Sequence, residues 1–263
     1  MKNKIISSVA FVLCIFVLFA FSGCNENTSS SKPQSAETAT VSATERASSA
    51  LPDNSFDLNT LHTFDPESED PFSGVWSITE GQGSQYEGFA YLFDGDGGAI
   101  LFTGNTGYRE KYSLDTDENG EQTFTAQLMF GINGIYSYEF NSSNTEVVLT
   151  NTDSEQKTTM KKIENYSPVP SAPENPETDE NILGAWKSED GEFFYFDQSG
   201  VMYQNLYNTM FTYAVYSAKD GKIVAEYSTG VENTNDKYDY SSDGDTLTLN
   251  DFKYSKIDVE ELL

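Results

Sequence analysis

Two aspartates one residue apart in a glycine-rich stretch are the first residues that could do chemistry. They are Asp94 and Asp96 in "YLFDGDGGAI", residues 91–100. A calcium loop of the EF-hand type places oxygen ligands at positions 1, 3 and 5, glycine at 6 and glutamate at 12. Counted from Asp94, positions 5, 6 and 12 are Gly98, Ala99 and Asn105. Only positions 1 and 3, Asp94 and Asp96, fit the calcium loop. We therefore predict a tight β-turn here and no metal site.

Acid–base and nucleophilic catalysis lack most of their usual residues. His62 is the only histidine in 263 residues, and it precedes the stretches that show strand periodicity. Neither stretch can therefore hold a Ser-His-Asp triad or a histidine zinc site. Phosphate-binding motifs of the G-x-x-x-x-G-K-[ST] and G-x-G-x-x-G types are absent. We predict a protein that is not an enzyme and uses no cofactor. A hydrolase built on paired carboxylates is the alternative, although 42 acidic residues bring such pairs together by chance.

The charge balance restricts the partners. Fifteen Lys and Arg against 42 Asp and Glu give a formal net charge of -27. A chain with this charge is repelled by nucleic acid and by anionic membrane surfaces. We therefore predict no nucleic-acid partner, while a basic ligand or a divalent cation stays compatible with the composition.

The first 24 residues have the layout of a secretory signal. A start with two lysines precedes an apolar run, and small residues follow before Cys24. The stretch "FSGC" resembles the lipobox of bacterial lipoproteins, with Phe21 where leucine is commoner. The resemblance implies a signal peptide over 1–23, a lipid on Cys24 and a lipid-anchored place on the outer face of a bacterial cell membrane. A plain secretory signal is the alternative. Because Cys14 leaves with the signal, the mature chain would have no disulfide.

Composition then divides the rest of the chain. Residues 24–70 begin with a Ser-, Thr- and Ala-rich stretch that cannot bury enough apolar surface to fold, so we predict a disordered tether. A second linker, 165–180, holds four of the eight prolines. Proline cannot donate to a strand ladder, and none falls within 72–164 or 181–258. We therefore predict two β-domains, 71–164 and 181–263.

The two predicted domains resemble each other and alternate with a period of two. "FD" at 93–94 corresponds to "FD" at 196–197, and "KKIE" at 161–164 corresponds to "SKID" at 255–258. Matching segments that follow one another in the same order indicate a tandem duplication. Short alternating runs such as "FTYAVYS" and "DTLTLN" are separated by turn residues, which gives about eight strands in each copy. We predict an all-β chain of two tandem antiparallel up-and-down β-barrels.

Each copy also begins with a G-x-W motif, Gly74 to Trp76 and Gly184 to Trp186. With the strand meander, these residues resemble the small lipocalin-like domains of bacterial surface lipoproteins. The resemblance implies that each tryptophan packs at the closed end of a barrel under a basic residue of the last strand.

Lys162 and Lys256 are the candidates for that basic residue. The resemblance also implies a small apolar ligand or a surface partner. Each copy is about half the length of a full lipocalin, and an eight-stranded barrel can be filled by its own side chains. A structural or adhesive protein with filled barrels is therefore the second reading.

Overall fold

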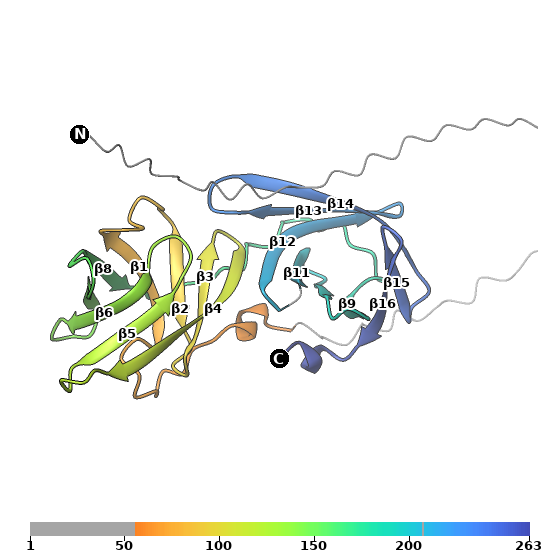
Figure 1. Cartoon of the computed structure of the whole chain (residues 1–263). Helices are drawn as coiled ribbons and strands as arrows, with labels where there is room; N and C mark the ends of the chain where they lie inside the picture. The colour runs from red at the N-terminus through yellow and green to blue at the C-terminus, as the bar shows by residue number, and fades with distance from the viewer. Residues whose placement is uncertain (1–55, 207) are drawn as a thin grey trace, which may run out of the picture. The chain divides into compact units, whose positions relative to one another are not determined.

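The computed structural model describes residues 56–206 and 208–263, which form an all-β structure (Figure 1). The predicted signal peptide, Cys24 and most of the tether lie outside these residues. No helix in the part of the chain that the structure describes is long and apolar enough to span a membrane. The elements are η1 (Leu58–Leu61), β1 (Gly74–Glu80), β2 (Phe89–Phe93), β3 (Gly98–Thr103), β4 (Thr106–Thr116), β5 (Gln122–Gln127), β6 (Asn133–Phe140), β7 (Glu146–Asn151), β8 (Lys157–Lys162), β9 (Gly184–Ser188), β10 (Phe193–Phe196), β11 (Val201–Leu206), β12 (Met210–Lys219), β13 (Lys222–Ser228), β14 (Asn233–Ser242), β15 (Thr246–Leu249), β16 (Phe252–Ile257) and η2 (Val259–Leu262).

Strands β9 to β16 form a closed eight-stranded antiparallel barrel. Each strand pairs with the next along the chain, and β16 returns to pair with β9. The hairpins are tight: Lys219 pairs with Lys222 across Asp220 and Gly221, whose φ angles of 52° and 74° both lie in the left-handed region. Asp-Gly suits such a turn because its twist matches that of the flanking strands.

Strands β1 to β8 are eight further strands that pair in the same antiparallel order, with β1 also paired to β8. A short ladder between β4 and β12 then joins all sixteen strands in one hydrogen-bonded sheet. The all-β prediction is confirmed, and so is a closed eight-stranded antiparallel barrel. The second of the two predicted tandem barrels is not confirmed, because the β4–β12 ladder connects the strands of both sets in one sheet.

Large aromatic side chains occupy the inner face of each set of strands. Trp76 lies among Phe72, Phe93, Phe124 and other buried residues of the first set. The second set encloses Trp186 with Phe194, Phe196, Tyr216 and their neighbours. Without a disulfide in the described residues, these clusters supply the apolar burial that stabilises each set.

A third apolar cluster lies on the outer faces of the strands, where the two sets meet. It includes Phe102 of β3 and Phe211 and Tyr213 of β12. Gly107 of β4 pairs with Phe211 of β12, and a Cβ atom at Gly107 would overlap the Phe211 ring. Gly107 therefore lets the aromatic side chain lie against the neighbouring backbone.

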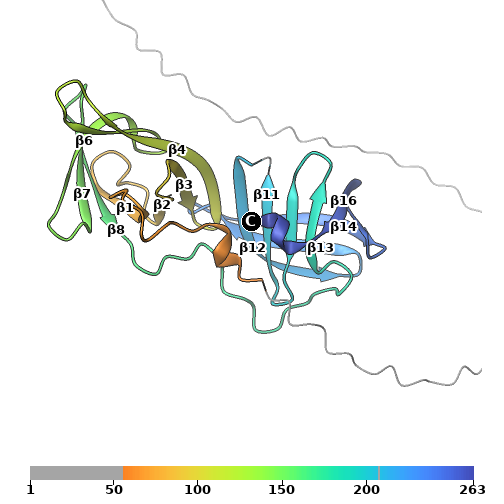
Figure 2. The same cartoon turned by 90° about the horizontal axis from the view of Figure 1, so that it is seen from below.

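Residues 56–66, which we call the strap, pack on this third cluster, whereas the sequence predicts a disordered tether that extends to residue 70. Leu58 of η1 is 5% exposed, and Phe56, Leu61 and Phe64 are partly buried against the same cluster. Figure 2 shows this orange segment beside β4 and β12. The strap folds because its spaced apolar residues find a ready-made apolar surface, which a composition average does not reveal.

The Pro-rich linker also contacts the strands. Asn105 Nδ2 donates to Pro168 O at 2.7 Å, and the Ala218 amide donates to Glu177 O at 2.7 Å. The linker is therefore fixed to both sets of strands at its two ends, although its sequence predicts only an extended spacer.

Candidate functional site

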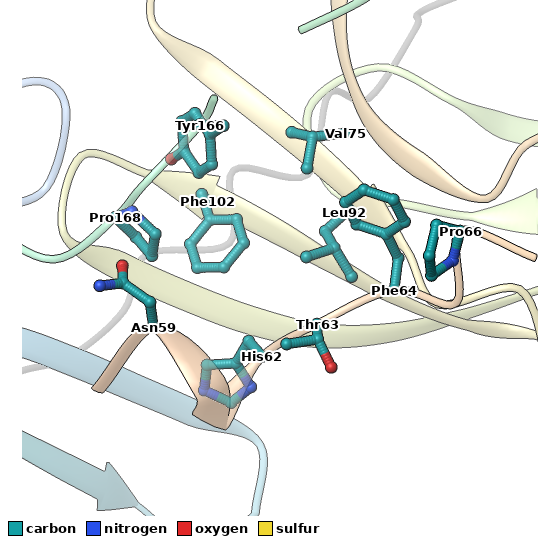
Figure 3. A pocket seen from close by; sticks show the side chains of 10 residues that line it. All are labelled: Asn59, His62, Thr63, Phe64, Pro66, Val75, Leu92, Phe102, Tyr166 and Pro168. Carbon is teal, nitrogen blue, oxygen red and sulfur yellow. The ribbon is translucent and has the colours of Figure 1, made fainter. Parts of the chain in front are cut away.

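A pocket of about 270 Å³ opens between the strap, the linker and the outer faces of β1, β2 and β3 (Figure 3). It lies outside the inner clusters, because its strand residues belong to the third cluster. Figure 3 shows the sheet residues on one side and the strap residues opposite them. The lining residues are Asn59, His62, Thr63, Phe64, Pro66, Val75, Leu92, Phe102, Tyr166 and Pro168.

The strand wall of the pocket is apolar because these strands are covered on both faces. All five residues of β2, "FAYLF", are buried. Tyr91 points into the first inner cluster, while its neighbour Leu92 points outward. Val75 of β1 lies in register with Leu92, which places the two aliphatic side chains side by side. An unbroken apolar run in a strand is the sequence signal for this double coverage, and it could have indicated an outer binding surface.

His62 of the strap forms the opposite wall and sits in an aromatic surround. Its ring stacks on Phe211, with centroids 3.8 Å apart and planes 23° apart. The rings of Tyr203, Tyr213 and Phe102 lie at 5.9, 6.2 and 6.4 Å. Its Nε2 atom is buried and has no hydrogen-bond partner. Burial, and after it the charge of Arg109, lowers the His62 pKa from 6.5 to about 3, so the ring is neutral at neutral pH.

Arg109 of β4 is the cation next to this wall. Its guanidinium lies 4.9 Å from the centroid of the Phe211 ring. It also donates to Asn205 Oδ1 at 3.1 Å and to the Tyr203 hydroxyl at 3.3 Å. Arg109 is therefore hydrogen-bonded to β11 and is not among the residues that line the pocket. With His62 neutral, none of the ten lining residues carries a charge at neutral pH.

A few hydrogen bonds hold the strap in place. The Phe56 amide donates to the Tyr195 hydroxyl at 3.3 Å, and the Tyr213 hydroxyl donates to Leu58 O at 3.3 Å. The Asp65 amide donates to Asp94 O at 3.0 Å. These bonds come from both sets of strands, so the strap closes one side of the pocket and also bridges the sixteen-stranded sheet.

The G-x-W residues lie apart from the pocket, in two equivalent arrangements. Trp76 Nε1 donates to Phe72 O at 2.6 Å, and Lys162 Nζ lies 5.5 Å from the Trp76 ring centroid. Gly74 has a φ of 134°, and a Cβ there would overlap the Lys162 side chain. In the first copy, glycine therefore leaves room for the lysine to cross the tryptophan.

The second copy repeats this arrangement. Trp186 Nε1 donates to Ile182 O at 2.6 Å, and Lys256 Nζ lies 5.2 Å from the Trp186 ring centroid. Gly184 has a φ of 104°. In each set of strands, a lysine of the last strand therefore lies over the buried tryptophan.

Asp94 has the turn-forming role expected of it. Its Oδ1 accepts the amides of Asp96 at 2.7 Å and Gly98 at 2.9 Å. In the second copy, Asp197 Oδ1 accepts the Ser199 amide at 2.8 Å. Within 56–206 and 208–263, no group of three or more His, Cys, Asp or Glu side chains is arranged to hold a metal ion.

The comparisons with known proteins found no relative of this chain. No protein-family model, curated protein or solved structure matches the chain. The function must therefore be inferred from the pocket and from the residues of the chain itself.

Proposed function

We propose that this chain is a non-catalytic extracytoplasmic lipoprotein that binds a small molecule in the pocket between its strap and β1–β3. The observation that carries the proposal is the composition of the pocket, whose lining is mostly apolar and uncharged. The pocket lies outside the inner clusters, which aromatic side chains occupy. The secretory layout of the first residues and the lipobox-like "FSGC" support display at a bacterial cell surface with Cys24 as the anchor.

The proposed architecture is a duplicated lipocalin-like barrel. Its support is the shared order of strand pairing in β1–β8 and β9–β16, together with the repeated lysine-over-tryptophan arrangement. In this proposal the two barrels support the binding site but do not contain it. The site exists because the chain has two copies that meet. The outer aromatic face on which the strap rests forms only where the two copies meet.

The ligand class follows from the charge and size of the pocket. A net charge of -27 disfavours anions. A desolvated cation would find no carboxylate among the lining residues. The volume of about 270 Å³ lies just below the range of ligand pockets, which span about 300–1,000 Å³. We therefore propose a small, flat, neutral molecule with one aromatic ring or two fused rings.

Isothermal titration of the full-length protein with indole at pH 7.5 tests this proposal. We expect saturable binding with one site per chain. Val75→Phe fills the space between the strands and the strap and should abolish the binding, with folding checked by circular dichroism. Val231→Phe is the matched control, because Val231 is 82% exposed, and it should bind like the parent protein. Equal indole binding by the two variants would contradict the assignment of the site.

A structural or adhesive surface protein is the second candidate function. The large aromatic side chains buried on the inner faces favour it, because a lipocalin-like barrel that its own side chains fill has no place for a ligand inside. Under this reading the strap serves only to join the two copies. Indole and related flat neutral compounds would then give no saturable heat with the parent protein.

A further inference from the structure

We propose that the strap is an acid-released cover of the pocket, and that protonation of His62 drives residues 56–66 away from the outer aromatic cluster. The consequence for a ligand rests on the proposed binding function. Release of the strap itself does not, because it can be measured on the ligand-free protein.

The position of His62 makes the strap sensitive to a proton. The partly buried imidazole is the part of the strap that stacks on Phe211, and the rings of Tyr203 and Tyr213 lie beside it. Protonation makes both ring nitrogens hydrogen-bond donors. Nε2 is buried without an acceptor, so in the closed strap an imidazolium would have a charged N–H without a partner. An unpaired buried charge is among the most costly features that a folded chain can hold.

The groups that face His62 do not compensate such a charge. β4 contributes the Arg109 guanidinium, and β11 and β12 contribute the Tyr203 and Tyr213 hydroxyl groups. From the linker, the Tyr166 phenol lines the same pocket. A protonated His62 would therefore share one aromatic cluster with a second cation.

The acidic groups nearest in sequence are engaged in local turns of the strap. Asp57 Oδ1 accepts the Asn59 amide at 3.0 Å, and Asp65 Oδ1 accepts the Glu67 amide at 2.9 Å. β3 faces His62 with the Phe102 ring, which has no titratable group. Among residues 56–206 and 208–263, no carboxylate is thus placed to pair with an imidazolium in the closed strap.

The direction of the effect follows from linkage. The His62 pKa is about 3 with the strap closed and near 6.5 once the ring reaches water. The open strap therefore binds the proton more tightly, and acid favours opening. Closure is fully stable above pH 6.5 and weakens about tenfold for each pH unit below it, until the closed form also protonates near pH 3. Between pH 7.5 and 4.5 the open population should rise roughly 100-fold.

The strap can open without unfolding the strands. It contains only the four-residue η1 and donates few backbone hydrogen bonds to the sheet. The opposite wall of the pocket belongs to β1, β2 and β3, whose ladders do not include the strap. Local opening of such a segment costs less than global unfolding.

Amide hydrogen exchange on the ligand-free, full-length protein tests the inference. The reporters are the hydrogen-bonded strap amides of Phe56, Thr60 and Asp65. After correction for the intrinsic pH dependence of exchange, we expect their protection to fall roughly 100-fold from pH 7.5 to 4.5, while the amides of β9–β16 keep theirs. In His62→Phe, which keeps an aromatic ring but cannot titrate, strap protection should change less than about threefold.

The outcomes separate the two proposals. Constant strap protection in the parent protein, or an equal loss in His62→Phe, would overturn the acid-release mechanism even if indole binds. Absence of indole binding at pH 7.5 would instead refute the proposed ligand and leave the exchange result to stand on its own. If both proposals hold, the parent protein should lose indole affinity at pH 4.5, and the His62→Phe affinity should change little with pH.

Discussion

We expect Phe211→Ala to weaken the contact between the two sets of strands more than any other single substitution. The Phe211 side chain is fully buried, stacks on His62 and lies 5.7 Å from the Phe102 ring, between centroids. Its ring covers Gly107, which has no side chain that could fill the space left behind. Truncating a buried phenylalanine costs about 3–5 kcal/mol, and we expect a value in that range because the site cannot collapse.

Two tryptophans allow the unfolding of each set of strands to be measured separately. Trp76 and Trp186 are the only tryptophans, and each lies in one inner cluster. Urea unfolding would be followed by fluorescence in the Trp76→Phe and Trp186→Phe backgrounds. Without the Phe211 substitution, the two reporters should give coincident transitions, because one sheet and one outer cluster span both sets.

Phe211→Ala should lower the free energy of unfolding by about 3–5 kcal/mol and separate the two transitions. The matched control is Phe252→Ala, because Phe252 is 68% exposed; its effect should stay within about 0.5 kcal/mol. A loss below about 1 kcal/mol, or transitions that still coincide, would refute the view that Phe211 couples the two sets.

Three further substitutions, one of them with a matched control, test other parts of the account. Gly107→Ala should cost about 1–3 kcal/mol in thermal unfolding, because its new methyl group overlaps a buried ring; an unchanged melting temperature would contradict this contact. Lys162→Met should cost about 1 kcal/mol through loss of its cation–π contact and its 2.8 Å hydrogen bond to Ser73 O, whereas Lys161→Met, which changes a lysine that is 56% exposed, should be nearly neutral. Cys24→Ala should release the protein from membranes into the soluble fraction, and unchanged membrane association would disprove lipid anchoring at this residue.

The sequence was most informative where a local pattern has one physical meaning. The period of two and the absence of proline from 72–164 and 181–258 were sufficient to predict an all-β chain. The G-x-W motifs marked the tryptophans, and the last strands supplied the lysines that cross them. The glycine-rich stretch after Phe93 correctly indicated a turn around Asp94.

The pocket could not be predicted in the same way, because it depends on contacts between distant segments. Alternation places Phe211 and Tyr213 on one face of β12 and Ala214 and Tyr216 on the other, but both faces are buried. The pattern therefore does not reveal which face meets the interior. The strap carries its apolar residues in a polar context, and only the outer cluster gives them a surface on which to fold.

A methyl-resolved NMR titration with indole at pH 7.5 tests the central claim most directly. The Val75 and Leu92 methyl groups line the pocket, whereas Leu247 and Leu249 lie in the inner cluster of the second set. We predict that the Val75 and Leu92 signals shift and saturate along one binding curve while the Leu247 and Leu249 signals stay in place. Unchanged pocket signals at saturating indole, or shifts of equal size in both groups, would contradict a binding site beneath the strap.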